Sequence, residues 1–273
     1  MAIEGDGSTI YLYASGAGPV FGSGVPCTLV SWFWADTANT LMMLSSCTSA
    51  EINNNRNTLL VTASGANVQV TAASRDTGNA LAMAAPTLAT GAWHHGAAVF
   101  ASDSSRIAYA NGTASAENTT TKTLSTIDTV VTLGRAITGS QAFDGRVAEQ
   151  AIYNAALRPT EIRELSLYRK CPLLVRPENL VWYRSYRSPL DFNWLPDYDE
   201  STTGNILRAP MVAAASPTYQ QHPENIVYPD WGPVPYGFVA AAGGVVTRAG
   251  LHEIESGAAG TFRQGLQPIG AGL

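Results

Sequence analysis

The sequence of 273 residues is poor in charge, and what charge it has is not basic. Only 14% of its residues are charged, against about 25% in an average soluble domain. Sixteen basic residues against 21 acidic ones leave a net charge of −5, and lysine occurs only at Lys122 and Lys170. Nucleic-acid binding requires a basic surface that neutralises phosphates, so this composition argues against a nucleic-acid partner.

Cysteine and long apolar runs are also scarce. Cys27, Cys47 and Cys171 show no CxxC spacing, which favours free, buried thiols over a disulfide framework or a zinc site. No apolar run approaches the ~18 residues of a membrane-spanning helix, so we expect no membrane partner. The N-terminal residues MAIEGDGSTIYLY contain two acids and no basic region, which is not typical of a secretory signal.

Short alternating apolar segments, broken by Gly, Asn, Asp and Ser, run from residue 8 to about residue 157 and are typical of half-buried antiparallel strands. In the segment 27–34, one face is predicted to hold Leu29, Ser31 and Phe33 and the other Val30, Trp32 and Trp34. The other predicted strands are 8–13, 40–45, 57–63, 66–72, 93–100, 106–110, 129–134 and 145–153, with Ser64-Gly65 as a hairpin turn. Only 157–165, with Pro159 near its start, indicates a helix. Nearly ten strands predict an all-β sandwich or barrel.

The second part of the chain has a different composition. Ten of the 15 prolines and ten of the 24 aromatic residues lie in 172–236. Dense prolines disfavour helix and central strand, whereas so many rings are unusual in a solvated linker. We therefore predict a sandwich over 1–170 and an extended arm over 171–236. The aromatic rings of this arm are expected to pack onto another protein surface. The tail 237–273, with nine Gly and seven Ala, cannot offset its ordering entropy alone, which predicts a homo-oligomer or larger assembly.

Three blocks resemble one family. They are 91–100 (GAWHHGAAVF) with 106–112 (RIAYANG), 143–157 (FDGRVAEQAIYNAAL) with Thr160-Glu-Ile162, and 28–34. In this order they are similar to strands of the laminin-G-like, concanavalin A-like jelly roll, over about residues 3–165. Ala148 and Arg158-Pro159 depart from the family's pattern, which usually has Asp and Ser there. The resemblance implies an antiparallel concanavalin A-like β-sandwich, a fold shared by lectins, glucanases, adhesins and viral structural proteins.

The sequence contains no complete catalytic motif. Jelly-roll glucanases resembling this fold use a Glu-x-Asp-x-x-Glu strand, and Glu4-Gly-Asp6 supplies only its first two acids. No stretch forms a Gly-x-Ser-x-Gly elbow. His94 and His95 are adjacent on a predicted strand, so their side chains point to opposite faces and cannot bind one metal together without a bulge. We therefore expect a protein that is not an enzyme.

Calcium is the one cofactor that the predicted loops could bind. The resemblance implies oxygen-rich loops at the rim of the sandwich, and Asp6, Asp103, Asn111 and Asp144 all lie in Gly- or Ser-rich turns. Turns ordinarily require the same residue types, so no cofactor and no metal ligand is predicted. Asn111 and Asn118 each begin a glycosylation sequon, and both are interpreted as turn residues.

Two sets of residues are candidates for binding. Arginine interleaved with aromatic residues has the composition of interface hot spots. The candidates for docking on a partner are therefore Trp182, Tyr183, Arg184, Tyr186, Arg187, Trp194 and Trp231. The stretch 158–187 holds seven of the 16 basic residues against three acids, and a solvated charged face is the alternative interpretation. If the protein binds sugar instead, the candidates are Asn53, Asn54, Asn55 and Arg56, in an Asn-rich loop.

Two functions are compatible with these observations. The leading hypothesis is a non-enzymatic virion structural protein, a bacteriophage capsid decoration or cement protein. It would lie on the outer capsid surface, with its C-terminal arm docked on the major capsid protein or other virion proteins. The alternative is a carbohydrate-binding adhesin, in a tail fibre or on a cell surface, with a glycan as its partner.

Overall fold

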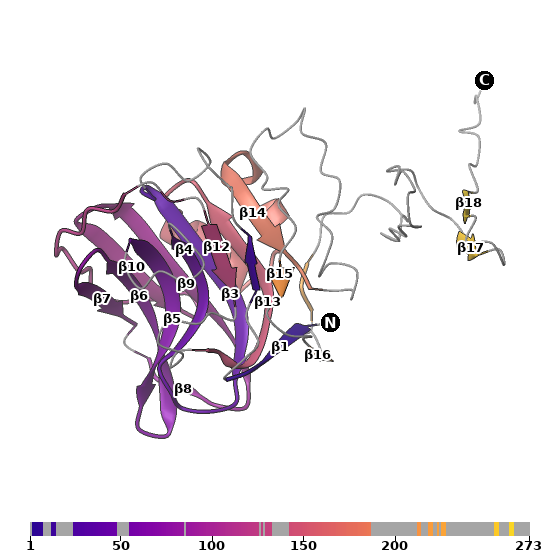
Figure 1. The fold of residues 1–273 in the computed structure, drawn as a ribbon, viewed down its shortest axis with the longest axis horizontal. Coiled ribbons are helices and arrows are strands. Elements are labelled where there is room, and N and C mark those ends of the chain that lie inside the picture. Colours follow the sequence, from indigo (N-terminus) through magenta and orange to yellow (C-terminus); the bar gives the residue numbers. More distant parts are fainter. Residues whose placement is uncertain are drawn as a thin grey trace.

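The described residues form two large antiparallel sheets that lie face to face (Figure 1), one short α-helix and a separate two-stranded sheet. The computed structural model describes residues 2–7, 12–14, 24–47, 55–84, 86–125, 127, 129–132, 142–186, 212–213, 218–220, 223, 225–227, 254–256 and 262–264. The predicted all-β antiparallel sandwich is confirmed. Among the described residues, no helix is both long and apolar enough to cross a membrane.

One sheet, called sheet A below, has the strand order β11–β10–β9–β3–β13–β1–β16, and β14 also pairs with β13. Its strands are β1 (Ala2–Asp6), β3 (Cys27–Ala35), β9 (Trp93–Ser102), β10 (Ser105–Ala110), β11 (Thr113–Ala114), β13 (Asp144–Tyr153), β14 (Leu180–Arg184) and β16 (Thr218–Gln220). The predictions for 27–34, 93–100, 106–110 and 145–153 are confirmed. β1 was not predicted, because Gly5 and two acids interrupt its apolar pattern.

The other sheet, sheet B, has the order β15–β2–β12–β4–β5–β6–β7, and β8 also pairs with β6. Its strands are β2 (Leu12–Ala14), β4 (Leu41–Cys47), β5 (Arg56–Ser64), β6 (Asn67–Arg75), β7 (Asn79–Met83), β8 (Leu88–Ala89), β12 (Thr129–Thr132) and β15 (Val212–Ala213). β5 and β6 form the predicted hairpin, with Ser64 opposite Asn67 and Gly65 at a φ of 63° in the turn. In the tail, β17 (Ile254–Ser256) pairs with β18 (Phe262–Gln264).

The main core lies between the two sheets and follows the alternation of β3. Leu29 and Phe33 are fully buried in it, together with Phe100 of β9 and Val147 of β13. Ser31, on the same face, accepts a hydrogen bond from the side chain of Gln150. The other face of β3 therefore carries Val30, Trp32 and Trp34, as the sequence predicted.

The helix α1 (Pro159–Ser166) covers part of this outer face of sheet A. It begins after Arg158, whose backbone N–H donates to the carboxylate of Glu161. Its buried residues Ile162 and Leu165 belong to a second apolar cluster, with Val30 and other outer-face residues of sheet A. Burial of these two side chains fixes the helix on the sheet and leaves another part of the outer face uncovered by it.

The sandwich extends beyond residue 170, where the sequence predicted its end. β14 pairs with β13, with Trp182 opposite Ile152 and Arg184 opposite Gln150. Five consecutive residues of β14 are buried, so the strand has no polar face and no alternating pattern. The missing alternation, together with the prolines that precede β14, is the reason that the sequence predicted an extended arm here. The predicted boundary at 170/171 is therefore corrected.

Further described parts of the predicted arm also lie on the chain's own sandwich. β15 pairs with β2 in sheet B, and β16 pairs with β1 in sheet A. The backbone N–H of Val227 donates to the carbonyl of Arg169, and its carbonyl accepts from the N–H of Cys171. The remainder of 171–236 and most of the tail 237–273 lie outside the described residues.

Candidate functional site

The outer face of sheet A carries a transverse row of large polar and aromatic side chains. Glu4 of β1 is the register partner of Arg146 in β13, Arg146 is the partner of Trp34 in β3, and Trp34 is the partner of Trp93 in β9. These four residues are called the tryptophan row. All four side chains are only partly buried, so they remain accessible to a ligand.

The two tryptophans of the row form a corner. Their ring centroids are 6.2 Å apart and their planes make an angle of 71°. The indole Nε1 of Trp34 donates a 2.9 Å hydrogen bond to the carboxylate of Asp36. This bond satisfies the polar edge of Trp34 and holds its ring in place, so the corner is preorganised.

Arg146 links the aromatic part of the row to its acidic end. Its guanidinium lies 5.0 Å from the centroid of the Trp34 ring, within the range of a cation–π contact. Its Nε lies 3.4 Å from Oε1 of Glu4, and the two side chains are 24% and 25% exposed. A guanidinium and a carboxylate therefore stand side by side next to an indole face, as donors and acceptors for a polar ligand.

A glycine allows β13 to approach β3 at this row. Gly145 has a φ of +139°, and a Cβ at this position would lie 2.0 Å from the carbonyl oxygen of Trp34. The segment Phe143-Asp-Gly-Arg146 thus combines a buried ring, a close backbone contact and the arginine of the row. Residues that resembled a family motif in the sequence therefore have a direct part in building the row.

The neighbouring residues along β3 and β9 are closed to solvent. Trp32 is the register partner of His95, their rings meet edge to face at 5.5 Å, and they are 5% and 1% exposed. The guanidinium of Arg169 lies over the Trp32 ring at 5.2 Å. Burial lowers the pKa of His95 from 6.5 to about 3, and its Nδ1 has no hydrogen-bond partner among the described residues. His95 is therefore neutral at physiological pH.

The histidine pair behaves as the sequence predicted. His95 meets Trp32 on the outer face, whereas the ring of His94 lies 5.8 Å from that of Phe33. Nδ1 of His94 is hydrogen-bonded to the side-chain amide of Asn111. The two imidazoles point to opposite faces of β9 and cannot bind one metal ion together.

Four of the seven predicted docking residues are buried in the chain's own sandwich. Trp182, Tyr183, Arg184 and Tyr186 are 0%, 8%, 2% and 1% exposed. The hydroxyl of Tyr183 donates to Glu149, and that of Tyr186 to the side chain of Gln150. The expectation that these four side chains face a partner is corrected, because they pack against β13 instead. Arg187, Trp194 and Trp231 lie outside the described residues.

The predicted sugar-binding loop is described only at its end. Asn53 and Asn54 lie outside the described residues. Asn55 adopts a φ of 53°, and Arg56, at the start of β5, is only 6% exposed between its register partners Cys47 and Arg75. The expectation that Arg56 faces a ligand is corrected, because the strand pairing buries it.

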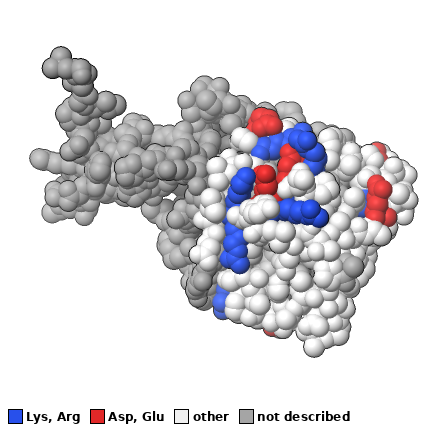
Figure 2. Space-filling view, turned by 180° about the vertical axis from the view of Figure 1, so that it is seen from behind, with Lys and Arg blue, Asp and Glu red and all other residues white. Residues whose placement is uncertain are grey.

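The basic stretch around α1 is compensated by its own acids. Glu161 lies within 4 Å of both Arg158 and Arg176, and Lys170 pairs with Glu164 at 3.2 Å. Figure 2 shows basic and acidic side chains interspersed on one face of the molecule, most of which is otherwise uncharged. This arrangement matches the alternative interpretation of the stretch, a solvated charged face.

The candidate calcium ligands are not brought together as a set. Asp6 and Asp144 are register partners in β1 and β13. The carbonyl of Asp103 accepts from Arg106, and Asn111 lies in the turn after β10, with its side-chain oxygen bound to the N–H of His95. In the described part of the chain, no group of three or more His, Cys, Asp and Glu side chains could hold a metal ion.

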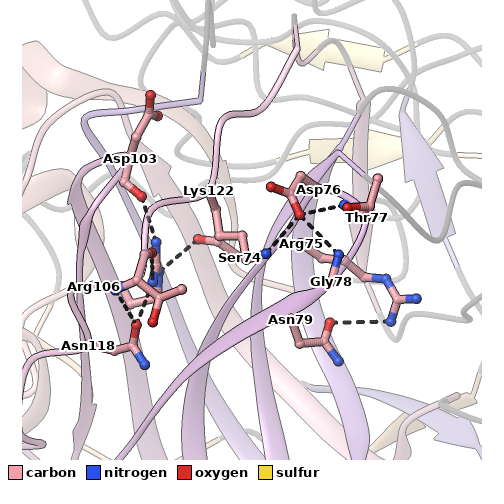
Figure 3. A network of polar contacts seen from close by, with 11 residues as sticks. Ser74, Arg75, Asp76, Thr77, Gly78, Asn79, Asp103, Arg106, Asn118 and Lys122 are labelled. Atoms are coloured by element: carbon pink, nitrogen blue, oxygen red, sulfur yellow. Dashed lines mark hydrogen bonds and ion pairs between the residues drawn. The ribbon is translucent and has the colours of Figure 1, made fainter.

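A second polar cluster lies at an end of the sandwich and has a structural role (Figure 3). Arg106 is fully buried, and its guanidinium donates to Ser74 Oγ, to Asn118 Oδ1 and to the carbonyls of Asp103 and Thr120. The side-chain amide of Asn118 in turn donates to the carbonyl of Leu81. Asn118 has a structural role, but it forms an antiparallel β-bridge with Arg106 instead of the predicted turn, and its side-chain nitrogen is already hydrogen-bonded.

Comparison with known proteins places the fold in a family. A model of the concanavalin A-like lectin/glucanases superfamily matches residues 6–163, well over half of the chain. The chain belongs to this superfamily. The match includes β3, β9 and β13, the strands of Trp34, Trp93 and Arg146, and it begins at Asp6, the last residue of β1, after Glu4. No curated protein sequence matches the chain.

Three solved structures illustrate the likeness of this concanavalin A-like chain to known folds. A heptameric SAP-like pentraxin from Limulus polyphemus has 16% identity and a TM-score of 0.47, covering 60% of this chain and 81% of the pentraxin. A putative carbohydrate-binding protein from Bacteroides ovatus has 16% identity and a TM-score of 0.48, covering 69% and 52%. The CBM40 of a Ruminococcus gnavus IT-sialidase, bound to sialyllactose, has 16% identity and a TM-score of 0.44, covering 61% and 98%. The likeness concerns the fold alone.

Proposed function

We propose that this protein binds carbohydrate at the tryptophan row, on the outer face of sheet A. The observation that carries the proposal is the corner of Trp34 and Trp93, partly exposed beside the Arg146–Glu4 pair. A sugar ring has an apolar C–H face and a rim of hydroxyls. The C–H face of the sugar can stack on an indole face, and its hydroxyl groups can hydrogen-bond to adjacent guanidinium and carboxylate groups. Membership of a superfamily of lectins and glucanases supports the same function.

We further propose that the protein binds its glycan without cleaving it. Hydrolysis needs two carboxyl groups in different environments, one of them kept protonated as the acid. Glu4 is instead ion-paired with Arg146, and Asp36 accepts the hydrogen bond of Trp34. Both carboxyl groups are thus engaged as acceptors in contacts with side chains of the row, an arrangement that suits recognition more than acid catalysis.

The test is a glycan array followed by titration calorimetry on the full chain. Wild-type protein should bind at least one neutral glycan, and Trp93→Ala should weaken that binding by about tenfold or more, as expected for an aromatic hot spot. Tyr168→Ala is the matched control, because Tyr168 is an aromatic residue that is 67% exposed and lies outside the tryptophan row. Failure of the wild type to bind any glycan, or equal losses in both variants, would refute the proposal.

The capsid decoration hypothesis stays a prediction. It was motivated by an arm and a tail that need partners, but the described parts of the arm up to Tyr186 pack on the chain's own sandwich. The remaining support comes from residues that lie largely outside the described part. Co-purification of the protein with intact phage particles is the measurement that would revive it.

A further inference from the structure

We propose that the tryptophan row recognises one neutral sugar unit, at the end or at a branch of a glycan, and not a stretch of several units. This inference rests on the carbohydrate-binding function proposed above and specifies its ligand. Three observations carry it: the angle between the two indoles, the closed surface next to them, and the balance of charge around them.

The ring angle restricts how many sugar units can stack. Consecutive units of an extended chain present roughly parallel faces, so two indoles that both stack on such a chain must be nearly coplanar. Trp34 and Trp93 make an angle of 71° with centroids 6.2 Å apart. A corner of this shape accepts one ring, which lies flat on one indole and meets the other with its edge.

Arg146 determines which indole is the stacking surface. Its guanidinium covers one face of the Trp34 ring at 5.0 Å, and the Trp34 Nε1 is tied to Asp36. We therefore assign Trp93 as the surface on which the sugar lies and Trp34 as the side wall. The Arg146–Glu4 pair continues the row on the other side of Trp34, where it offers donors and acceptors to hydroxyl groups that project past this side wall.

On the side towards α1, the described residues next to the row offer no second stacking platform. Trp32 is the next outer-face aromatic residue along β3, but it is only 5% exposed beneath the guanidinium of Arg169. Beyond it, outer-face residues such as Val30 are covered by the cluster that contains α1. A second sugar unit would therefore lack a stacking partner in this direction among the described residues.

The charges around the row favour a neutral ligand. Among the described residues, the ionisable ones of this part of the outer face are Glu4, Asp6, Asp36, Asp144, Arg146 and Arg169. The carboxylates outnumber the guanidinium groups, and Glu4 already occupies Arg146, the group that a ligand carboxylate would need. A neutral sugar instead supplies hydroxyl donors to these carboxylate acceptors.

The experiment measures affinity against chain length and charge. The full-length protein is titrated with glucose, galactose, mannose, xylose and arabinose, with their oligosaccharides up to hexasaccharides, and with the corresponding uronic acids. For the sugar that binds, the methyl glycoside should bind within about threefold of the hexasaccharide. Trp93→Ala should weaken both interactions by about tenfold or more, and Trp93→Phe should restore part of the affinity because it keeps a flat ring.

The outcomes separate this inference from the function on which it rests. Binding that depends on Trp93 but rises tenfold or more with chain length would overturn the single-unit assignment and leave carbohydrate binding intact. Preference for a uronic acid would overturn the neutral assignment. Absence of all binding, or binding insensitive to Trp93, would overturn the proposed function together with the inference.

Discussion

Burial of His95 should make the stability of the protein fall as the pH falls. His95 is 1% exposed, and its environment lowers the pKa from 6.5 to about 3. In the unfolded chain the imidazole takes up a proton below pH 6.5, whereas in the folded protein it stays neutral until about pH 3. The unfolded state therefore binds more protons between these values. The contribution of neutral His95 to the free energy of unfolding is present above pH 6.5 and is lost as the pH falls towards 3.

The size of the loss follows from the two pKa values. At about 1.36 kcal/mol for each pKa unit, the difference between 6.5 and about 3 corresponds to about 5 kcal/mol at pH 3 and below. Between pH 7 and pH 5 the same relation gives about 2 kcal/mol. For a domain of this size, 2 kcal/mol lowers the melting temperature by about 4–8 °C.

Thermal and urea unfolding at several pH values measure this effect, and two variants isolate it. His95→Phe keeps a ring against Trp32 and removes the unpartnered Nδ1, so it should flatten the pH dependence between pH 7 and pH 5 by about 2 kcal/mol. His95→Gln should flatten it equally if Phe does not fit. Burial lowers the pKa of His94 as well, so His94→Gln, at the neighbouring position on the opposite face, is the comparison variant: it should keep the part of the pH dependence that comes from His95. The same pH dependence in the wild type and both His95 variants would refute the reasoning.

Two further predictions concern the row and the polar cluster. Gly145→Ala should destabilise the protein by about 2–4 kcal/mol in chemical denaturation and weaken glycan binding, because its φ is unfavourable for Ala and its Cβ would meet the Trp34 carbonyl; an unchanged midpoint and affinity would contradict this. Arg106→Met should cost about 3 kcal/mol or more, because it removes the hydrogen bonds of a fully buried guanidinium to the buried Ser74 and the partly buried Asn118. Arg75→Met, beside the exposed Asn79, is the control and should change stability by less than about 1 kcal/mol.

The predicted fold came from patterns within single strands. The alternation in 27–34 placed Leu29 and Phe33 on one face and the two tryptophans on the other, and the structure shows that the first face lies in the core. The strand β14 was missed because both its faces are buried, so its sequence carries no period of two, and nearby prolines pointed to an arm. A prediction from periodicity fails where burial is uniform.

The candidate site could be predicted only in part. The pair Trp32 and Trp34 on one face was visible in the sequence, but their partners Trp93, Arg146 and Glu4 come from three other strands. Strand register decides which side chains meet, and a single sequence contains no direct signal for register. The predicted binding residues were therefore aromatic residues of the arm, which lie close together in sequence but do not form an exposed cluster in the described structure.

The pairing of β1 with β13 has a consequence for synthesis of the chain. Glu4 and Arg146 are 142 residues apart in sequence, so strand β1, made first, has no partner in β13 until more than half of the protein has been translated. β14, which also pairs with β13, follows later still. Contacts this distant slow folding and leave apolar strand residues exposed on the nascent chain. The tryptophan row, which spans the same pairing, is therefore completed late in biogenesis, and the proposed glycan site can form only after the central sheet has closed.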